Sequence, residues 1–408
     1  MVRKSRIKYL LIKELTKFTL FSLITILIIS VLQSRSEKIA NQFDLNEETQ
    51  LFYKKNFSHI KNNQEKICPL YPKELEGLFN VDLSVIPSLE DLKRQIPNLE
   101  EDGSFKPRSC IPREKLAIII PYRNRLTNLV LLLKYLHPML QKQSRYYRVF
   151  LVEQYGDDVF NKGRIMNIAV NEALKVDNFN CFIFHDVDLI PENDRNIYEC
   201  YIHPRHLSIA IDELRYNLMY FNLVGGVLAL NLDQLNKTNG YSNLYWGWGA
   251  EDDDMSMRIL DNGYEIMRPT NQVGRYKMIL HGKRSRAINR FELLEYWKRY
   301  KRDGLNSLKD LKYEIKSLEN NYLYTNITVD IGPSVIESVD KKQIKHSKFN
   351  CVGHQPHVQL KLAVLSPNGH GHRQHQHVRS QPQPQNNVSD HDCLLAIPKN
   401  SWSSMNNW

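Results

Sequence analysis

Two tryptophans and four consecutive acids lie together in the stretch Trp246-Gly247-Trp248-Gly249-Ala250-Glu251-Asp252-Asp253-Asp254. Adjacent carboxylates repel one another and resist burial, so their place beside aromatic side chains indicates a site for a polar ligand or a cation. A solvated acidic loop is the alternative, because most charge runs are exposed. Gly247 and Gly249 favour the site, since they free the backbone around Trp248 and let its indole move over a ligand.

A second group of polar residues consists of Arg123, Arg125 and the triplet Asp186-Val187-Asp188. On an extended segment Asp186 and Asp188 point the same way, while Val187 points into the protein. Two carboxylates suit a divalent cation and arginine forks suit phosphate, so the group predicts a phosphate-bearing ligand bridged by a metal. The alternative is a pair of aspartates that cap or turn the chain before a proline.

The apolar pattern places these polar residues at the ends of strands. It predicts strands and helices in alternation, over Lys115–Pro121, Leu126–Gln141, Tyr147–Gln154, Gly163–Lys175 and Cys181–Phe184. This order predicts an α/β fold with a mostly parallel, Rossmann-type sheet flanked by helices. Ligands collect at the carboxyl ends of such strands, which is where both arginines and the aspartates fall.

The charge of the chain is concentrated at its N-terminus. The 408 residues carry a formal net charge of +10 and 42% apolar residues. Residues 1–17 hold six Lys or Arg and one Glu, which is +5, and the uncharged run 18–34 follows them. We expect a cytosolic tail, a transmembrane signal anchor and a lumenal remainder, with no nucleic-acid partner. A cleaved signal peptide is the alternative, but no small-x-small site follows the run cleanly.

The rest of the chain divides by composition. Residues 35–106 are polar and interrupted by prolines, which predicts a lumenal stem and a packed approach to the domain at 107–331, and 332–408 is a low-complexity His- and Gln-rich tail. We interpret the histidine-rich part of this tail as disordered chain, and transition-metal binding is the alternative. Glycosylation sequons begin at Asn56, Asn236, Asn326 and Asn387. Six cysteines in a lumenal chain predict disulfides.

Several motifs occur in the order seen in the β-1,4-galactosyltransferase family, which is glycosyltransferase family 7. They are Pro121-Tyr122-Arg123-Asn124-Arg125, Asp186 to Pro191, the stretch 246–254, Met278-Ile279-Leu280-His281 and Tyr324 to Ile331. The resemblance runs from Cys68 to Ile331. It implies a Golgi, single-pass type II, metal-dependent enzyme with a GT-A-like fold that inverts the anomeric centre of a UDP-sugar.

The resemblance also implies roles for individual residues. The Mn²⁺ ligands would be Asp188, Met278 and His281, although a thioether is an unusual ligand for a hard ion. The donor contacts would be Pro121, Arg123, Arg125, Phe160, Asp186, Val187, Leu223 and Trp248. The acceptor, a terminal GlcNAc, would be bound by Tyr220, Asp252, Asp253, Arg290, Phe291 and Leu294. The catalytic group would be Asp252 as base, with Glu251 and the closing Trp248. The implied disulfides are Cys68–Cys110 and Cys181–Cys200, and Cys351 and Cys393 have no counterpart.

One departure from the family bears on the donor sugar. Leu223 stands where galactose-using members have a tyrosine, and leucine leaves room for an acetamido group at C2 of the donor. The sequence therefore predicts UDP-GalNAc, with UDP-Gal as the alternative donor. An alternative of another class is a non-catalytic sugar-binding or transferase-partner protein, which we would expect to lack the base or a metal ligand. Ala250 replaces a common family glycine and is expected to stiffen its loop slightly.

Overall fold

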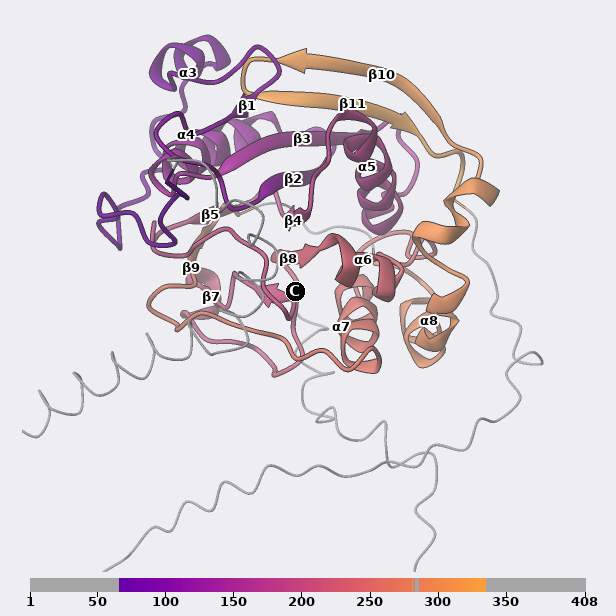
Figure 1. The fold of residues 1–408 in the computed structure, drawn as a ribbon. Coiled ribbons are helices and arrows are strands. Elements are labelled where there is room, and N and C mark those ends of the chain that lie inside the picture. The colour runs from indigo at the N-terminus through magenta and orange to yellow at the C-terminus, as the bar shows by residue number, and fades with distance from the viewer. Residues whose placement is uncertain (1–65, 281, 283–285, 335–408) are drawn as a thin grey trace, which may run out of the picture. The chain divides into compact units, whose positions relative to one another are not determined.

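The computed structural model describes residues 66–280, 282 and 286–334, which belong to one compact unit (Figure 1). The expected tail, anchor and most of the stem (1–65), the C-terminal segment beyond 334, Asn56, Asn387, Cys351 and Cys393 lie outside these ranges. Within the described ranges, no helix is both long enough and apolar enough to cross a membrane.

The central sheet is mixed. Its strands follow the order β10-β11-β3-β2-β4-β8-β6, and β1 pairs with β3. The bounds of these strands are β1 Ser104–Phe105, β2 Lys115–Tyr122, β3 Tyr146–Gln154, β4 Cys181–His185, β6 Arg205–His206, β8 Val227–Asn231, β10 Glu314–Asn321 and β11 Tyr324–Asp330. Only β11, β3, β2 and β4 run parallel to their neighbours in series, and β1, β6, β8 and β10 pair antiparallel. The α/β prediction is confirmed, and the expectation of a mostly parallel sheet is corrected to a mixed one.

A second, three-stranded sheet joins segments that are distant in the sequence. It consists of β5 Leu189–Pro191, β9 Arg275–Met278 and β7 Ala210–Ile211, in that order. The helices are α3 Leu89–Gln95, α4 Leu126–Lys142, α5 Lys162–Val176, α6 Leu232–Thr238, α7 Glu251–Asp261 and α8 Arg290–Glu295. Short 3-10 turns are η2 Asp212–Leu214, η3 Trp297–Lys301 and η4 Leu305–Asp310.

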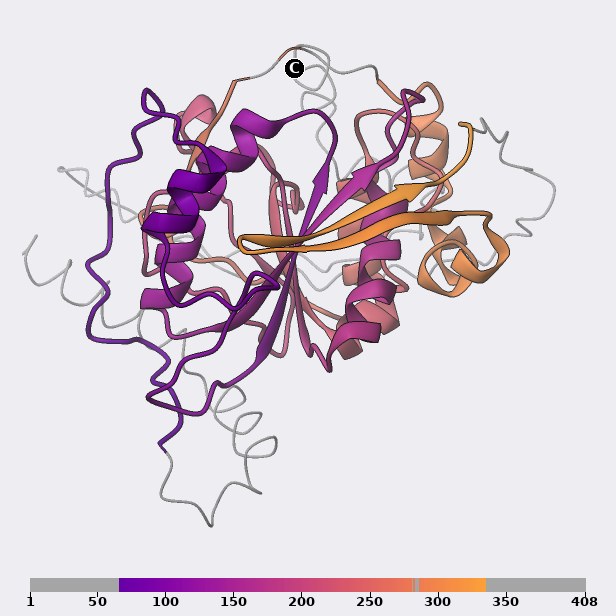
Figure 2. The same ribbon diagram turned by 90° about the horizontal axis from the view of Figure 1, so that it is seen from above.

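The side chains of β2 alternate between two cores, as expected for a strand covered on both faces. Leu116, Ile118 and Ile120 pack with α4, while Ala117 and Ile119 pack with α5. Figure 2 shows these two helices on opposite sides of the sheet. The predicted strands and helices from Lys115 to Phe184 are confirmed, with ends that agree or differ by one residue.

The segment 66–106 is part of this domain. Cys68 forms a disulfide with Cys110, α3 buries Leu92 and Ile96 in the core with α4, and β1 adds a short strand to the sheet. The predicted packed approach therefore begins by Cys68. The second predicted disulfide, Cys181–Cys200, is also present and braces the start of β4.

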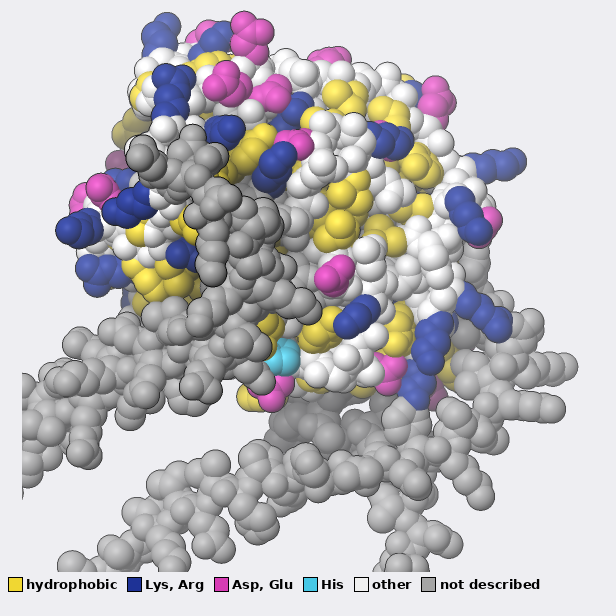
Figure 3. Space-filling model, viewed as in Figure 1, with side chains coloured by type: hydrophobic (Ala, Val, Ile, Leu, Met, Phe, Trp, Pro, Cys, Tyr) yellow, Lys and Arg dark blue, Asp and Glu magenta, His cyan; other side chains and the backbone are white. Residues whose placement is uncertain are grey.

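Two sequons lie in described elements. Asn236 is exposed in α6, whereas Asn326 is half-buried in β11 and donates to Thr328 Oγ1 over 3.3 Å. On the face shown in Figure 3, the described Lys and Arg side chains are scattered among acidic ones rather than gathered into one basic area.

Candidate active site

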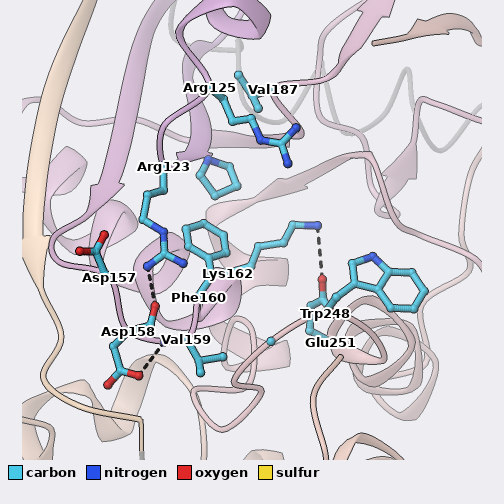
Figure 4. Close-up of a pocket in the computed structure, with 12 residues that line it drawn as sticks. Arg123, Arg125, Asp157, Asp158, Val159, Phe160, Lys162, Val187, Trp248 and Glu251 are labelled. Carbon is cyan, nitrogen blue, oxygen red and sulfur yellow. Dashed lines mark hydrogen bonds and ion pairs between the residues drawn. The ribbon is translucent and has the colours of Figure 1, made fainter. Parts of the chain in front are cut away.

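A cavity of about 370 Å³ opens where β2, β3 and β4 end (Figure 4). Seven residues expected from the family resemblance line it, namely Pro121, Arg123, Arg125, Phe160, Val187, Trp248 and Glu251. Gly247, which the sequence had placed beside Trp248 in the candidate site, also lines it, and four further lining residues were not predicted: Asp157, Asp158, Val159 and Lys162. The cavity is therefore built by the loops after three parallel strands and by the stretch before α7, as the strand order predicts.

Arg123 joins the loop after β2 to the loop after β3. Its Nη1 donates to the carbonyl oxygens of Asp158 and Gly156, at 2.6 and 3.3 Å, and its guanidinium lies 5.2 Å from the centre of the Phe160 ring. Figure 4 shows Arg123 and Phe160 side by side, with Arg125 above them near Val187, and Trp248 with Glu251 on the opposite side. Although Asp157, Asp158 and Glu251 also line the cavity, the two arginines supply guanidinium groups of the kind that bind a diphosphate.

Asp186 to Leu189 form a tight turn rather than an extended segment. Leu189 N donates to Asp186 O over 3.3 Å, and Asp186 N donates to Gly226 O over 3.0 Å. Val187 is buried, as predicted, but the expectation that both aspartates project alike from an extended segment does not hold, because the chain reverses here. The turn was the alternative interpretation of the sequence.

Two of the three predicted metal ligands, Asp188 in the turn before β5 and Met278 at the end of β9, lie next to each other. Leu189 of β5 pairs with Met278 of β9, and Ile279 N donates to Asp188 O over 2.8 Å, so the backbones at Asp188 and Met278 are adjacent. The third predicted ligand, His281, lies outside the described residues. In the described part of the chain, the one cluster of three His, Cys, Asp or Glu ligand atoms is Glu114 with the Cys181–Cys200 disulfide, which leaves no thiolate to bind a metal.

Lys162 lies at the centre of the acidic residues. Its Nζ is 3.0 Å from Asp186 Oδ1, 3.4 Å from Asp252 Oδ2 and 3.6 Å from Glu251 Oε1. Burial alone would lower the pKa of Lys162, but these three carboxylates outweigh it and hold that pKa well above its usual range. One ammonium group thus connects the turn after β4 with the start of α7.

The same surroundings act on the carboxylates. Burial raises the pKa of Asp252 above its usual range, Lys162 opposes the rise, and Glu251 and Asp186 add to it. Burial also raises the pKa of Asp253 to about 6, although a hydrogen bond from Tyr220 opposes this shift. A carboxylate whose pKa approaches neutrality is suited to accept a proton from a hydroxyl group.

The sequence did not identify Lys162 as a site residue, because a lysine near the start of a helix is normally expected to be exposed to solvent. Asn161 caps α5, where its side chain accepts a hydrogen bond from Arg164 N over 2.9 Å. Lys162 therefore follows the cap directly, in a first turn where the helix dipole disfavours a positive charge. This unfavourable placement of a positive charge was the one feature of the sequence that could have indicated acidic partners near Lys162.

The four acids of the 251–254 run divide into two groups. All four stand in the first turn of α7, where they complement the helix dipole. Glu251 and Asp252 face Lys162, and Asp253 Oδ1 accepts a 2.7 Å hydrogen bond from Tyr220. Asp254 instead is fully buried and binds Arg258 and Arg299. Asp254 is thus structural, while its three neighbours face the site.

Asp254→Asn should lower stability without altering the site directly. The substitution leaves the guanidinium groups of Arg258 and Arg299 facing a neutral partner, and breaking a buried ion pair costs about 3–5 kcal/mol. We expect the midpoint of thermal unfolding to fall by on the order of 10 °C. The control is Asp310→Asn at an exposed position, which should leave the midpoint nearly unchanged. Equal midpoints for both variants would contradict the structural role.

The backbone around Trp248 has the freedom that the sequence suggests. Gly247 and Gly249 have φ angles of 98° and 106°, and Ala250 also has a left-handed φ of 71°. Trp248 O accepts a 3.0 Å hydrogen bond from Ala287 N, and the indole is half-exposed beside Glu251 in Figure 4. Ala250 therefore occupies a conformation that a family glycine adopts without strain.

The predicted acceptor residues lie beside α7. A Cβ atom placed on Gly249 would be 3.2 Å from Arg290 Cδ, so Arg290 reaches the stretch that carries Trp248. The guanidinium of Arg290 lies over the ring of Phe291 at 4.3 Å, and Leu294 is half-buried one turn later. The segment 289–302 is divided into α8 and η3, and Arg299 of η3 is thereby placed against Asp254.

Leu223 lies near the candidate base. A Cβ atom on Gly225 would lie 2.8 Å from Asp252 Oδ2 and 3.5 Å from Leu223 Cδ1. The loop thus approaches the carboxylate so closely that only glycine fits at position 225 without displacement. The structure thus brings Leu223, Gly225 and Asp252 together.

Comparison with known proteins identifies the family. The protein-family model for the N-terminal region of glycosyl transferase group 7 matches residues 68–201. A second family model, for the N-terminal domain of galactosyltransferase, matches residues 205–282. Mouse β-1,4-galactosyltransferase 1 is 43% identical over 269 residues, which are 65% of this chain and 67% of the relative. Human β-1,4-galactosyltransferase 3 is 43% identical over 270 residues, 65% of this chain and 68% of the relative. The chain belongs to the β-1,4-galactosyltransferase family.

This membership makes the chain a glycosyltransferase and accounts for the motif order noted in the sequence. Among solved structures, the catalytic domain of Drosophila β-1,4-galactosyltransferase 7 in complex with xylobiose is 28% identical, with a TM-score of 0.47 over 54% of this chain and 94% of that one. Both matched family segments contribute to the galactosyltransferase-family site, since the cavity draws on residues before 201 and after 205.

Proposed function

We propose that the chain transfers GalNAc from UDP-GalNAc to O4 of a terminal GlcNAc on glycoproteins or glycolipids, with inversion and with Mn²⁺ as cofactor. The observation that carries the proposal is that Asp252 lies 3.4 Å from Lys162, which lines a cavity together with Arg123 and Arg125. Leu223 does not line that cavity, but Leu223 and Asp252 both lie close to Gly225. UDP-Gal is the alternative donor with the same acceptor. A non-catalytic sugar-binding role is disfavoured, because the candidate base and its acidic neighbours are all in place.

In this mechanism the arginines bind the diphosphate of the donor, and Trp248 closes over the sugar. Asp252 accepts the proton of the acceptor hydroxyl as its oxygen attacks C1, while Glu251 and Asp253 orient the acceptor. Attack from the face opposite UDP converts an α donor into a β product in one displacement, without a covalent enzyme intermediate. The positive charge of Lys162 favours the ionised form of Asp252 and opposes the rise in its pKa that burial causes.

The residues present fit a divalent metal, since Asp188 and Met278 lie next to each other where β5 and β9 pair. His281 follows Met278 by three residues in the sequence. These residues would hold Mn²⁺, which when bound stabilises the negative charge that develops on the leaving UDP. The structure of a Drosophila β-1,4-galactosyltransferase 7 mutant has been determined with manganese, UDP-Gal and xylobiose. We further propose a Golgi membrane location, single-pass type II, through the run 18–34.

The donor assignment is tested with the purified full chain, Mn²⁺ and a β-linked GlcNAc acceptor, by comparing kcat/KM for UDP-GalNAc and UDP-Gal. We expect a preference for UDP-GalNAc of about tenfold or more, because Leu223 leaves space for the acetamido group. Leu223→Tyr should reverse the preference, and Leu223→Ile serves as the matched apolar control. A preference of the unmodified chain for UDP-Gal would reject the donor assignment.

A further inference from the structure

The loop that carries Leu223 has no regular structure to hold it. Residues 215–226 connect η2 with β8 as turns and irregular chain, and the Phe221 side chain is 79% exposed. A loop of this kind keeps a defined position only if groups outside it bind its backbone. The contacts that hold it therefore decide how firmly Leu223 is placed beside the donor site.

Arg268 makes the contact nearest to Leu223. Its Nη2 donates to the carbonyl oxygens of Phe221 and Leu223, at 2.6 and 3.0 Å, and its guanidinium lies 5.4 Å from the centre of the Phe221 ring. One nitrogen thus bridges the two carbonyls on either side of Asn222. Arginine suits this task because its planar guanidinium presents several donors in a fixed geometry.

Arg268 is itself carried by an anchored segment. Met267 N donates to Pro204 O over 2.8 Å, and Met267 O accepts from His206 N over 2.9 Å, so the backbone just before Arg268 is tied to β6. Proline follows at position 269 and restricts the backbone of Arg268. The guanidinium of Arg268 therefore fixes the position of the loop relative to the central sheet.

Other contacts hold the loop on both sides of the Leu223 carbonyl. Arg275 stacks on Tyr216 at 3.5 Å, Asp186 N donates to Gly226 O over 3.0 Å, and within the loop Leu223 N donates to Tyr220 O over 3.2 Å. Tyr220 donates to Asp253 Oδ1 over 2.7 Å, and Gly225 O accepts from His206 Nε2 over 2.8 Å and from Ser208 Oγ over 3.2 Å. Leu223 lies between these points, and its carbonyl oxygen is bound by Arg268. Removal of the guanidinium would leave the loop fixed at 220 and 225 and loosened at 223.

We propose that Arg268 is a positioning residue for donor discrimination, which fixes the backbone at 221–223 so that the residue at 223 is a rigid wall against the donor sugar. This inference rests on the proposed donor-selective role of Leu223. A rigid wall excludes a poorly fitting donor, whereas a wall that yields by a fraction of an ångström accepts both donors. Arg268 need not touch the donor to exert this effect.

The test compares Arg268→Met and Arg268→Lys with the unmodified chain. For each, kcat and KM are measured separately for UDP-GalNAc and UDP-Gal with one acceptor. Methionine keeps an unbranched apolar side chain but no donor, and we expect the ratio of kcat/KM values for the two donors to fall about tenfold toward one. Arg268→Lys keeps the positive charge and one donor group in place of the guanidinium. Its donor ratio should lie between that of Arg268→Met and that of the unmodified chain. The kcat for the preferred donor should change far less than the ratio.

Arg275→Met is the matched control. Arg275 is partly buried, lies 3.5 Å from Glu192 and stacks at 3.5 Å on Tyr216, at the start of the same loop. It therefore contacts the loop without binding the carbonyl oxygens of Phe221 and Leu223, which Arg268 binds. Its substitution should leave the donor ratio unchanged. A purely structural role of Arg268 would lower kcat equally for both donors, and an unchanged ratio in Arg268→Met would overturn the proposal. If that variant does not fold, an unchanged ratio in Arg268→Lys would overturn it.

The failure of this inference can be told apart from failure of the proposed function by Leu223→Tyr in the same assay. A shifted donor preference in Leu223→Tyr together with unchanged ratios in both Arg268 variants rejects the role of Arg268 alone. No shift in Leu223→Tyr rejects the donor-selective role of Leu223 and, with it, the inference built on it.

Discussion

Asp252→Asn should reduce kcat by about 10²–10⁴-fold while the KM for the UDP-sugar changes little, because the substitution removes the group that accepts the proton of the acceptor hydroxyl and leaves the arginines of the donor cavity untouched. The measurement is steady-state transfer with saturating Mn²⁺, together with direct titration of UDP binding. Retention of the unmodified turnover rate would reject Asp252 as the base.

Stability provides the control for this variant. Burial raises the pKa of Asp252, so its ionised form is less favourable in the folded state than in the unfolded chain. A carboxyl group with a raised pKa costs stability as the pH rises above its unfolded value. Asp252→Asn should therefore unfold at the same temperature or a higher one at pH 7. Asp253→Asn, one residue away, should affect the KM of the acceptor more than kcat.

Lys162→Met should shift the acidic limb of the pH–rate profile to higher pH and lower kcat/KM at pH 7 by at least about tenfold. Lys162 is the cation that opposes the rise in the pKa of Asp252, so without it that pKa rises further. The base acts when deprotonated, so activity is lost as the pH falls through its pKa. A higher pKa therefore moves the loss upward. The profile of kcat/KM against pH measures the shift.

Two lysine variants make this test specific. Lys162→Arg keeps the positive charge and should keep the acidic limb near its original position. Lys175→Met lies in the same helix, but Lys175 is 67% exposed and pairs with Glu172, so its loss should leave the profile unchanged. An acidic limb that does not move in Lys162→Met would show that Lys162 does not control the protonation of Asp252.

The sequence predicted the parts of the fold that have strong local patterns. The strands and helices from Lys115 to Phe184 each bury a continuous or periodic apolar face, and such patterns are visible in one sequence. The antiparallel strand β8 was not predicted, because it is as short as β4 but reaches its partner only through a long connection. Pairing across that distance depends on tertiary contacts that no local pattern records.

For the site, residue types were predictable and their contacts were not. The family resemblance named Arg123, Phe160 and Trp248, which line the cavity. Nothing in the run 251–254 distinguishes Asp254 from its neighbours, since all four are acids and only the turn of α7 directs Asp254 to Arg258. Lys162 and Arg268 act through partners that are distant in the sequence, so both lay beyond a residue-by-residue interpretation.

The disulfide between Cys68 and Cys110 has a practical consequence for recombinant work. A secreted form cut at residue 107, where the composition changes, would lose Cys68 along with the core residues of α3. It would expose the apolar face of α4 that Leu92 and Ile96 cover, and it would leave Cys110 with an unpaired thiol able to join two molecules. A secreted form should therefore start upstream of Cys68, within the segment that composition alone indicates to be a stem.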